Sequence, residues 1–201
     1  MKHIKGIIFT CLFVCSPSLF ALCQGFISFG YGPSFPLGKL NDYIDHASWR
    51  AFNLEGGYFL TDGLAVGVSF SWYGYYKSFP YDTYENVGGS TVTISGRQWR
   101  YSNVYPLMAK IRYYLPLKGD LKPFIGAGLG PCFVNRRLDF GVWSFTDHTT
   151  QFGFYPELGL SYWIISGFAL SLDARYNYAV RNKDLEAHSN VALNLGLVWK
   201  F

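Results

Sequence analysis

The sequence is poor in charged residues and lacks a long apolar segment beyond its N-terminal residues. Only 15% of its 201 residues are Asp, Glu, Lys or Arg, whereas soluble domains average about 25%. Half of the residues are hydrophobic and 20% are aromatic. After residue 23 no run reaches the roughly 18 apolar residues that a membrane-spanning helix requires. If such a chain spans a bilayer, the structure that remains is a closed β-barrel, because it satisfies every backbone hydrogen bond.

The N-terminal segment has the composition of a secretory signal. Lys2 and Lys5 make its first residues basic, residues 6–14 are almost wholly apolar, and small residues precede Cys23. This order predicts a signal peptide over residues 1–23 that is cleaved near Cys23. Lipidation of this cysteine is the alternative, although the leucine before it does not suit a lipoprotein signal.

Cysteine usage and net charge exclude two further classes. Three of the four cysteines fall in the predicted signal peptide, so only Cys132 remains in the predicted mature domain, residues 24–201. One cysteine excludes an internal disulfide framework. Without the two signal lysines, 15 basic residues face 13 acidic ones. We therefore expect no nucleic-acid partner, since such binding usually needs a clustered basic excess.

Strict alternation of apolar and polar residues is the dominant pattern, and it is typical of β-strands. It is clearest near the C-terminus, where one face carries Val191, Leu193, Leu195, Leu197, Trp199 and Phe201. Such segments predict eight strands, near 25–36, 51–60, 64–76, 98–115, 122–137, 151–164, 168–180 and 189–201. Short turns alternate with longer polar connections, among them residues 37–50 and 138–150. The pattern predicts an all-β, antiparallel, up-and-down transmembrane barrel with periplasmic termini and four extracellular loops.

A soluble eight-stranded barrel is the alternative that shares this alternation. The polar face is rich in small residues, namely Gly67, Gly126, Gly128, Gly130, Gly159 and Gly196. Small residues suit the crowded interior of a narrow barrel better than a solvated exterior, so the membrane barrel is favoured. Pro106 and Pro156 interrupt strand interiors, and since proline cannot donate to the ladder we expect β-bulges there.

Several segments resemble a known family. Residues 106–115 (PLMAKIRYYL), a short turn and residues 123–130 (PFIGAGLG) resemble the middle of small outer-membrane β-barrels. These include the membrane domain of outer membrane protein A and the proteins grouped as the porin family. Residues 30–36 (GYGPSFP) are similar to the first strand of that family. Terminal Trp199 and Phe201 resemble the aromatic signal that the barrel-assembly machinery reads, which implies that machinery as a partner and the bacterial outer membrane as the location.

Charged residues also occur at positions of inward parity. They are Glu55, Lys110, Arg112, Glu157, Asp173, Arg175 and Lys200. An unpaired charge in a narrow interior is very costly. We therefore expect a salt-bridged polar network that fills the barrel, with a proton or ion path as the alternative.

Aromatic residues dominate the second long connection. The candidates for contact with a surface partner are Tyr75, Tyr76, Phe79, Tyr81 and Tyr84. Alternation returns over residues 91–95, beyond a glycine-rich turn at 85–90, which predicts a hairpin that protrudes from the membrane. Its edge could recruit another strand. The alternative is that these aromatics form the interfacial girdle of the barrel.

Histidines near acids or serine raise the question of catalysis. They lie at Asp45-His46, at Asp147-His148 and at His188-Ser189. Neighbouring strand residues point to opposite faces, so His188 is poorly placed to activate Ser189. We expect no catalytic residues, and we expect neither a metal site nor another cofactor.

The sequence therefore predicts a non-enzymatic outer-membrane protein that uses its loops for surface binding, adhesion or envelope integrity. Basic residues expected near the outer rim make lipopolysaccharide a candidate partner: Arg50, Arg97, Arg100, Arg136, Arg137, Arg181 and Lys183. An unknown surface partner is the second candidate. A lipid A-modifying enzyme or protease, and a narrow channel for small apolar solutes, stay open as alternatives.

Overall fold

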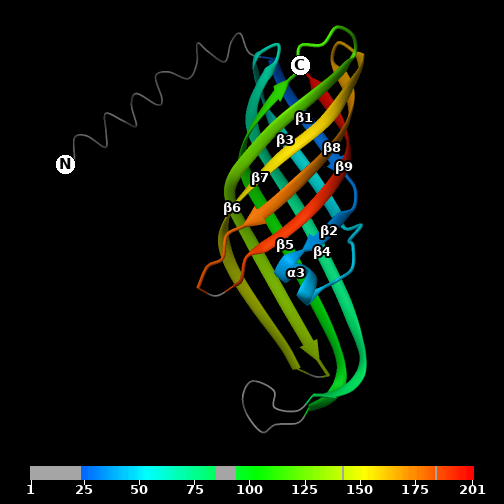
Figure 1. Ribbon diagram of the computed structural model, residues 1–201, viewed down its shortest axis with the longest axis vertical. Helices are drawn as coiled ribbons and strands as arrows, with labels where there is room; N and C mark the ends of the chain where they lie inside the picture. The colour runs from blue at the N-terminus through cyan, green and yellow to red at the C-terminus, as the bar shows by residue number, and fades with distance from the viewer. Residues whose placement is uncertain (1–23, 85–93, 142, 184) are drawn as a thin grey trace, which may run out of the picture.

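The protein forms one tilted barrel of antiparallel strands with a single short helix in its described part (Figure 1). This computed structural model describes residues 24–84, 94–141, 143–183 and 185–201. The predicted signal peptide, residues 1–23, and the predicted turn at 85–90 lie outside the described residues. The elements are β1 (Gln24–Tyr31), β2 (Ser34–Leu37), α3 (Gly38–Tyr43), β3 (Ala51–Thr61), β4 (Leu64–Tyr84), β5 (Ile94–Tyr114), β6 (Leu121–Phe140), β7 (Trp143–Ile165), β8 (Phe168–Ala179) and β9 (His188–Lys200). None of the described helices is long and apolar enough to cross a membrane.

Eight strand positions close the ring. Neighbours pair in the order β1, β3, β4, β5, β6, β7, β8, β9, and β1 also pairs with β9. β1 and β2 both pair with β9 and share one position, separated at Gly32 and Pro33. Glycine is required at this break, because a Cβ on Gly32 would lie 1.9 Å from the Leu193 carbonyl oxygen. The predicted eight-stranded antiparallel barrel is confirmed.

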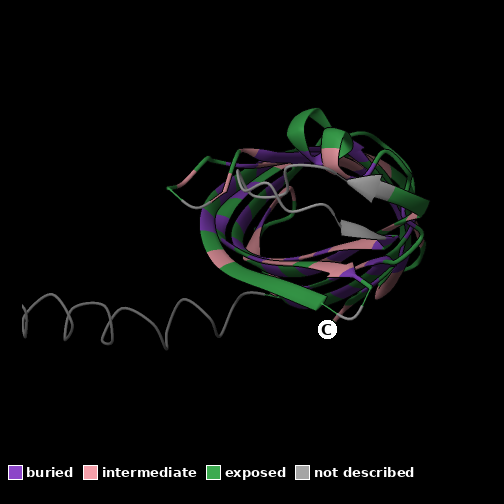
Figure 2. Ribbon diagram, turned by 90° about the horizontal axis from the view of Figure 1, so that it is seen from below, coloured by how far each residue is buried: buried purple, intermediate pink, exposed green. Residues whose placement is uncertain are grey.

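Buried and exposed residues alternate along the strands where they form the ring (Figure 2). On β9, Asn194 and Val198 are buried, whereas the intervening Leu195 is 64% exposed and Trp199 is 67% exposed. The apolar face predicted from the sequence is therefore the outer face. It suits contact with lipid, as in outer-membrane barrels, where an apolar band surrounds the wall.

Four strands are much longer than the bilayer requires. β4, β5, β6 and β7 have 20 to 23 residues each, although about 9–11 suffice to cross. Pairing of β4 with β3 ends at Tyr73, and pairing of β7 with β8 ends at Gly153. Beyond these points β4–β7 continue as a four-stranded sheet, which we call the extension, at the end of the barrel opposite the C-terminus (Figure 1).

The extension agrees with one loop prediction and corrects another. β4 and β5 run on as the predicted hairpin, although its tip lies outside the described residues. The loop predicted over residues 138–150 was wrong, because β6 continues to Phe140 and β7 begins at Trp143. Gly141, at φ +58°, turns the chain tightly between them. Polar residues such as Thr146, Thr149 and Thr150 indicated a loop, but threonine is β-branched and also suits a strand that is exposed on both faces.

The bulges predicted at Pro106 and Pro156 are also wrong. The register is the same on both sides of each proline. Pairing is instead interrupted locally without a change of register: Pro106 has no paired residue on β4, and Pro156 has none on β8. Irregularities occur between Phe59 and Thr61, between Phe79 and Tyr81, and between Trp163 and Ile165.

Inward glycines give a first test of how tightly the interior is filled. A Cβ on Gly126 would lie 2.6 Å from Glu157 Oε1 and 2.7 Å from the Ile111 carbonyl oxygen. We expect Gly126→Ala to lower the free energy of unfolding by about 1–3 kcal/mol through overpacking. The measurement is urea unfolding of vesicle-folded protein, followed by tryptophan fluorescence. Gly56→Ala is the control, since its Cβ would meet nothing nearer than 3.9 Å; equal losses in both variants would contradict a filled interior at Gly126.

Candidate functional site

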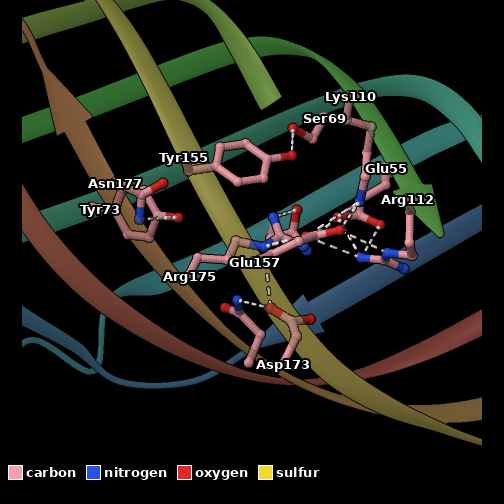
Figure 3. A network of polar contacts seen from close by, with 12 residues as sticks. Glu55, Ser69, Tyr73, Lys110, Arg112, Tyr155, Glu157, Asp173, Arg175 and Asn177 are labelled. Atoms are coloured by element: carbon pink, nitrogen blue, oxygen red, sulfur yellow. Dashed lines mark hydrogen bonds and ion pairs between the residues drawn. The ribbon is translucent and has the colours of Figure 1, made fainter. Parts of the chain in front are cut away.

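Six charged side chains from four strands meet inside the barrel (Figure 3). We call them the charge cluster: Glu55 on β3, Lys110 and Arg112 on β5, Glu157 on β7, and Asp173 and Arg175 on β8. All six are at most 5% exposed. They are drawn together because alternation places each of them on the lumen face, at similar heights in the ring.

Lys110 and Arg112 join the two glutamates. Lys110 Nζ lies 2.7 Å from Glu55 Oε1 and 3.2 Å from Glu157 Oε1. Arg112 Nε donates a hydrogen bond to Glu157 Oε1 at 2.7 Å, and its Nη2 lies 3.2 Å from Glu55 Oε2. Each carboxylate therefore faces two cations of β5.

Arg175 completes the cluster from the other side. Its Nη2 donates to Glu55, and its Nε lies 3.1 Å from both Glu157 Oε2 and Asp173 Oδ2. Asn194 Nδ2 donates to Asp173 at 2.7 Å. Three cations and three anions balance, so each member of the cluster has a buried counter-charge; an uncompensated one would be strongly destabilising.

These contacts cross the full width of the barrel. Glu55 on β3 and Glu157 on β7 share Lys110, Arg112 and Arg175, although their strands are four positions apart in either direction around the ring. An eight-stranded barrel is just wide enough for its interior to be filled by side chains. The cluster thus occupies the lumen rather than lining a passage.

Aromatic and hydroxyl side chains fill the lumen on both sides of the charge cluster. Toward the end with the short turns, Phe26, Phe59, Tyr114 and Phe124 are buried together. Lys200 belongs to this end: its ammonium lies 4.7 Å from the centre of the Phe59 ring, and in the described structure it forms no ion pair with the cluster. Of the seven interior residues singled out in the sequence, the structure therefore brings six together.

The opposite end, which we call the mouth, is covered by the connection between β2 and β3. Leu40 of α3 and Ile44 are completely buried against inward residues of β4–β6, including Tyr73 and Val134. Just below, the hydroxyls of Tyr75 and Ser34 lie 2.5 Å apart. Asn190 Nδ2 donates to the same serine at 2.8 Å. The mouth is thus closed by the chain itself.

Some of the aromatic candidates for partner binding point into the barrel and others point outward. Tyr75 is 2% exposed and belongs to the mouth, because its position has inward parity. Phe79 is partly buried between Lys77 and Arg100, whose charged groups lie 4.6 and 4.5 Å from its ring centre. Tyr76 and Tyr81 are 42% and 71% exposed. The side chain of Tyr84 lies outside the described residues.

The other predicted positions are placed as follows. Trp199 and Phe201 are 67% and 69% exposed, where they could be recognised during assembly, and that role stays a prediction. His188 is 2% exposed, and neither of its ring nitrogens has a hydrogen-bond partner in the described structure. Ser189 Oγ donates instead to the Leu37 carbonyl. Among the described residues no group of three or more His, Cys, Asp or Glu could hold a metal ion.

Sequence reasoning missed the uncharged partners of the interior. Tyr155 is 2% exposed, and its hydroxyl lies 2.9 Å from Ser69 Oγ across the lumen. Asn53 accepts a hydrogen bond from Arg175 at 2.9 Å. Inward parity is the sequence signal that places Tyr155, Ser69 and Asn53 in the interior.

The charge cluster predicts a large effect of removing one carboxylate. Glu157→Gln leaves Arg112 and Arg175 short of a buried counter-charge, so we expect the free energy of unfolding to fall by about 3–5 kcal/mol. Urea unfolding in vesicles measures this. Asp139→Asn is the control, because its ion-pair partner Arg137 is 55% exposed at the surface and surface pairs contribute about 0–1 kcal/mol. A loss no greater than that of the control would show that the cluster does not hold the barrel together.

Comparison with known proteins agrees with this architecture. A family model described as "Outer membrane protein beta-barrel domain" matches residues 27–201. No curated protein sequence matches the chain.

Solved structures share the fold at low sequence identity. Neisserial surface protein A (NspA) is 18% identical with a TM-score of 0.59, covering 88% of this chain and 97% of its own. Ail, the attachment invasion locus protein of Yersinia pestis, is 16% identical with a TM-score of 0.54, covering 89% of this chain and 99% of its own. A major outer membrane protein from Thermus thermophilus is 14% identical with a TM-score of 0.52, covering 89% of this chain and 99% of its own. The chain therefore belongs to the outer membrane protein β-barrel domain family and is a protein of the bacterial outer membrane.

Proposed function

We propose that this protein is a closed, non-enzymatic surface protein whose extension recruits an extended strand of an extracellular protein. The filled lumen and covered mouth support a role outside the barrel rather than through it. The observation that carries the proposal is the unpaired edge of β7 in the extension, where β8 has already ended. An exposed edge strand presents unpaired backbone donors and acceptors to which another strand can add.

The two edges of the extension differ in their protection. At the β4 edge, Pro80 sits within the irregularity between Phe79 and Tyr81. Lys77 on the same strand forms a 2.7 Å ion pair with Asp45 from the connection that covers the mouth. Proline, bulges, lysine and a covering loop are the devices by which proteins prevent unwanted strand pairing.

Over residues 143–148 the described structure shows none of these devices at the β7 edge; the connection after β8 reaches this strand at Thr149 and Thr150, to which Asn182 donates hydrogen bonds. Residues 143–149 contain neither lysine nor proline, and their register with β6 is continuous. Trp143 and Phe145 are 64% and 58% exposed. These two aromatic side chains share one face of β7, where they could pack on alternate residues of an added strand. An extended polypeptide of another protein is therefore the partner that fits.

Other partners stay as predictions for separate tests. The barrel-assembly machinery is expected to recognise the exposed C-terminal aromatics Trp199 and Phe201. A structure of Ail in complex with the heparin analogue sucrose octasulfate shows that a barrel of similar fold can hold a surface ligand. Lipopolysaccharide is the corresponding candidate for the basic rim of this chain.

Strand recruitment can be tested with a defined peptide. Residues 133–140 of β6 pair with β7 along its other edge, so a synthetic peptide of this sequence is a matched strand. We expect it to bind the folded protein saturably and to slow hydrogen exchange of amides in residues 143–149. Thr146→Lys should weaken this binding, because an edge lysine opposes strand addition.

Ser78→Lys is the control for that experiment, since it adds the same charge to the already protected β4 edge. It should leave peptide binding unchanged. Equal weakening by both variants, or protection confined to other strands, would count against recruitment at β7.

The channel alternative has its own test. Because the charge cluster spans the lumen, we expect the wild-type protein to produce no ion-conducting steps in planar lipid bilayers. Single-channel recording at symmetric salt is the measurement, with a large porin as a positive control for insertion. Steady, reproducible conductance steps from the folded protein would overturn the closed barrel and favour the channel alternative.

A further inference from the structure

Two arginines of the extension converge on one tyrosine of the connection that covers the mouth. The guanidinium carbon of Arg100, on β5, lies 5.0 Å from the centre of the Tyr43 ring. That of Arg136, on β6, lies 4.9 Å from the same ring. Tyr43 ends α3 and is partly buried, so the α3 segment brings both cations to one place above the lumen.

Both arginines have buried donors without acceptors. Arg136 Nε and Nη2 and Arg100 Nε are inaccessible to solvent and make no hydrogen bond in the described structure. The remaining bonds of Arg100 are long, at 3.3 Å to the Tyr43 carbonyl and 3.4 Å to Gln98 Oε1. In the part of the chain that the structure describes, neither arginine forms an ion pair with a carboxylate. Unsatisfied donors on charged groups are costly, which makes this arrangement unusual for a purely structural contact.

A histidine of the mouth has the same property. His188, at the start of β9, is 2% exposed, and both ring nitrogens lack a partner among the described residues. The charge of Arg136 acts on this ring, which also lies 6.4 Å from the ring of Tyr75. The mouth therefore holds three side chains whose nitrogens have unused hydrogen-bonding capacity.

Arg136 also borders a hollow of about 330 Å³. The other lining residues are Val134, Asp147, His148, Thr149 and Leu185. Asp147 faces Arg136 directly in the β6–β7 ladder, yet within the described part of the chain the two form no ion pair. The volume is sufficient for a small anionic group with part of the sugar or headgroup that carries it.

The neighbouring charges leave the site positive. Lys77 is neutralised by Asp45 at 2.7 Å, and Arg137 by Asp139 at 2.7 Å. Asp147 is then the one described carboxylate that lines the hollow, beside Arg136. Arg100 adds a second positive charge at the Tyr43 ring that it shares with Arg136.

We propose that Arg100 and Arg136 bind a phosphate or sulfate monoester at the mouth. A tetrahedral oxyanion presents several acceptors in different directions, which suits donors that come from two separate guanidinium groups. Arginine forks bind such groups through paired, charge-assisted hydrogen bonds. The hollow borders β7 at Asp147, His148 and Thr149, but the proposed contacts are side-chain donors of β5 and β6, so anion binding does not depend on backbone pairing at the β7 edge.

Glucose 6-phosphate and glucose 6-sulfate are suitable soluble probes, with glucose as the uncharged reference. Isothermal titration of the folded full-length protein, in detergent free of lipopolysaccharide, should show saturable binding of at least one ester and none of glucose. Arg100→Gln and Arg136→Gln should each weaken that binding roughly ten-fold or more, because each removes charge-assisted hydrogen bonds.

Arg137→Gln is the matched control, since it neutralises the next residue on β6, which points away from the site and pairs with Asp139. It should leave the affinity unchanged. Asp147→Asn provides a test in the opposite direction. Removing the carboxylate that competes with the ester for Arg136 should strengthen binding. A variant that is only less stable would not bind more tightly. Equal losses in Arg136→Gln and Arg137→Gln, or no gain in Asp147→Asn, would overturn the assignment.

A second arm separates the two sources of such an ester. Micelles containing lipid A are compared with micelles containing lipid A whose phosphates have been removed. Phosphate-dependent binding in micelles, lost in Arg136→Gln, identifies a membrane headgroup, whereas binding of the soluble sugars identifies a free or glycan-borne ester. Absence of binding in both arms would refute the site.

Discussion

The neutral charge cluster across the lumen is the interaction on which this barrel depends. Its outer surface faces hydrocarbon, so apolar residues there gain little from contact with one another. Beyond the backbone ladder, cohesion between side chains must come from the interior, where Glu55 and Glu157, on opposite sides of the ring, share the same three cations. Each bond that satisfies a buried charge also ties two distant strands together. The ion pairs can therefore balance the buried charges only when the strands are in register and the ring is closed.

Filling the centre has consequences for both ends. The aromatic group around Phe59 and Phe124 packs toward the short turns, and Leu40 and Ile44 of the β2–β3 connection close the mouth. Solute passage is thereby opposed along the whole length of the lumen. The parts of the molecule that remain free to meet other molecules lie beyond the ring, in the extension and the rim. The two proposals use different groups of the extension and the mouth. One concerns backbone pairing at the edge of β7, and the other concerns anion binding by the side chains of Arg100 and Arg136 near Tyr43.

Local patterns predicted local properties well. Alternation along residues 189–201 predicted which side chains face outward, because the period of a strand is a property of the backbone alone. Prediction from local patterns failed where one residue type is compatible with two structures. Thr146, Thr149 and Thr150 were interpreted as part of a polar loop, but strands that project into water tolerate polar residues on both faces. At Pro106 the missing donor was correctly identified, and only its consequence was wrong: pairing with β4 is interrupted without a bulge.

The sequence by itself determined the fold class, the eight strands, the apolar outer face and the set of inward charges. These follow from periodicity and composition, which act between neighbours in the chain. The tertiary structure alone decided which inward charges meet: six converge, whereas Lys200 lies against Phe59. It alone also brought Tyr43 to Arg100 and Arg136, and buried Tyr75 in the mouth. Contacts across a closed ring depend on register and on the path of the covering connection, and neither can be deduced from parity along a single strand.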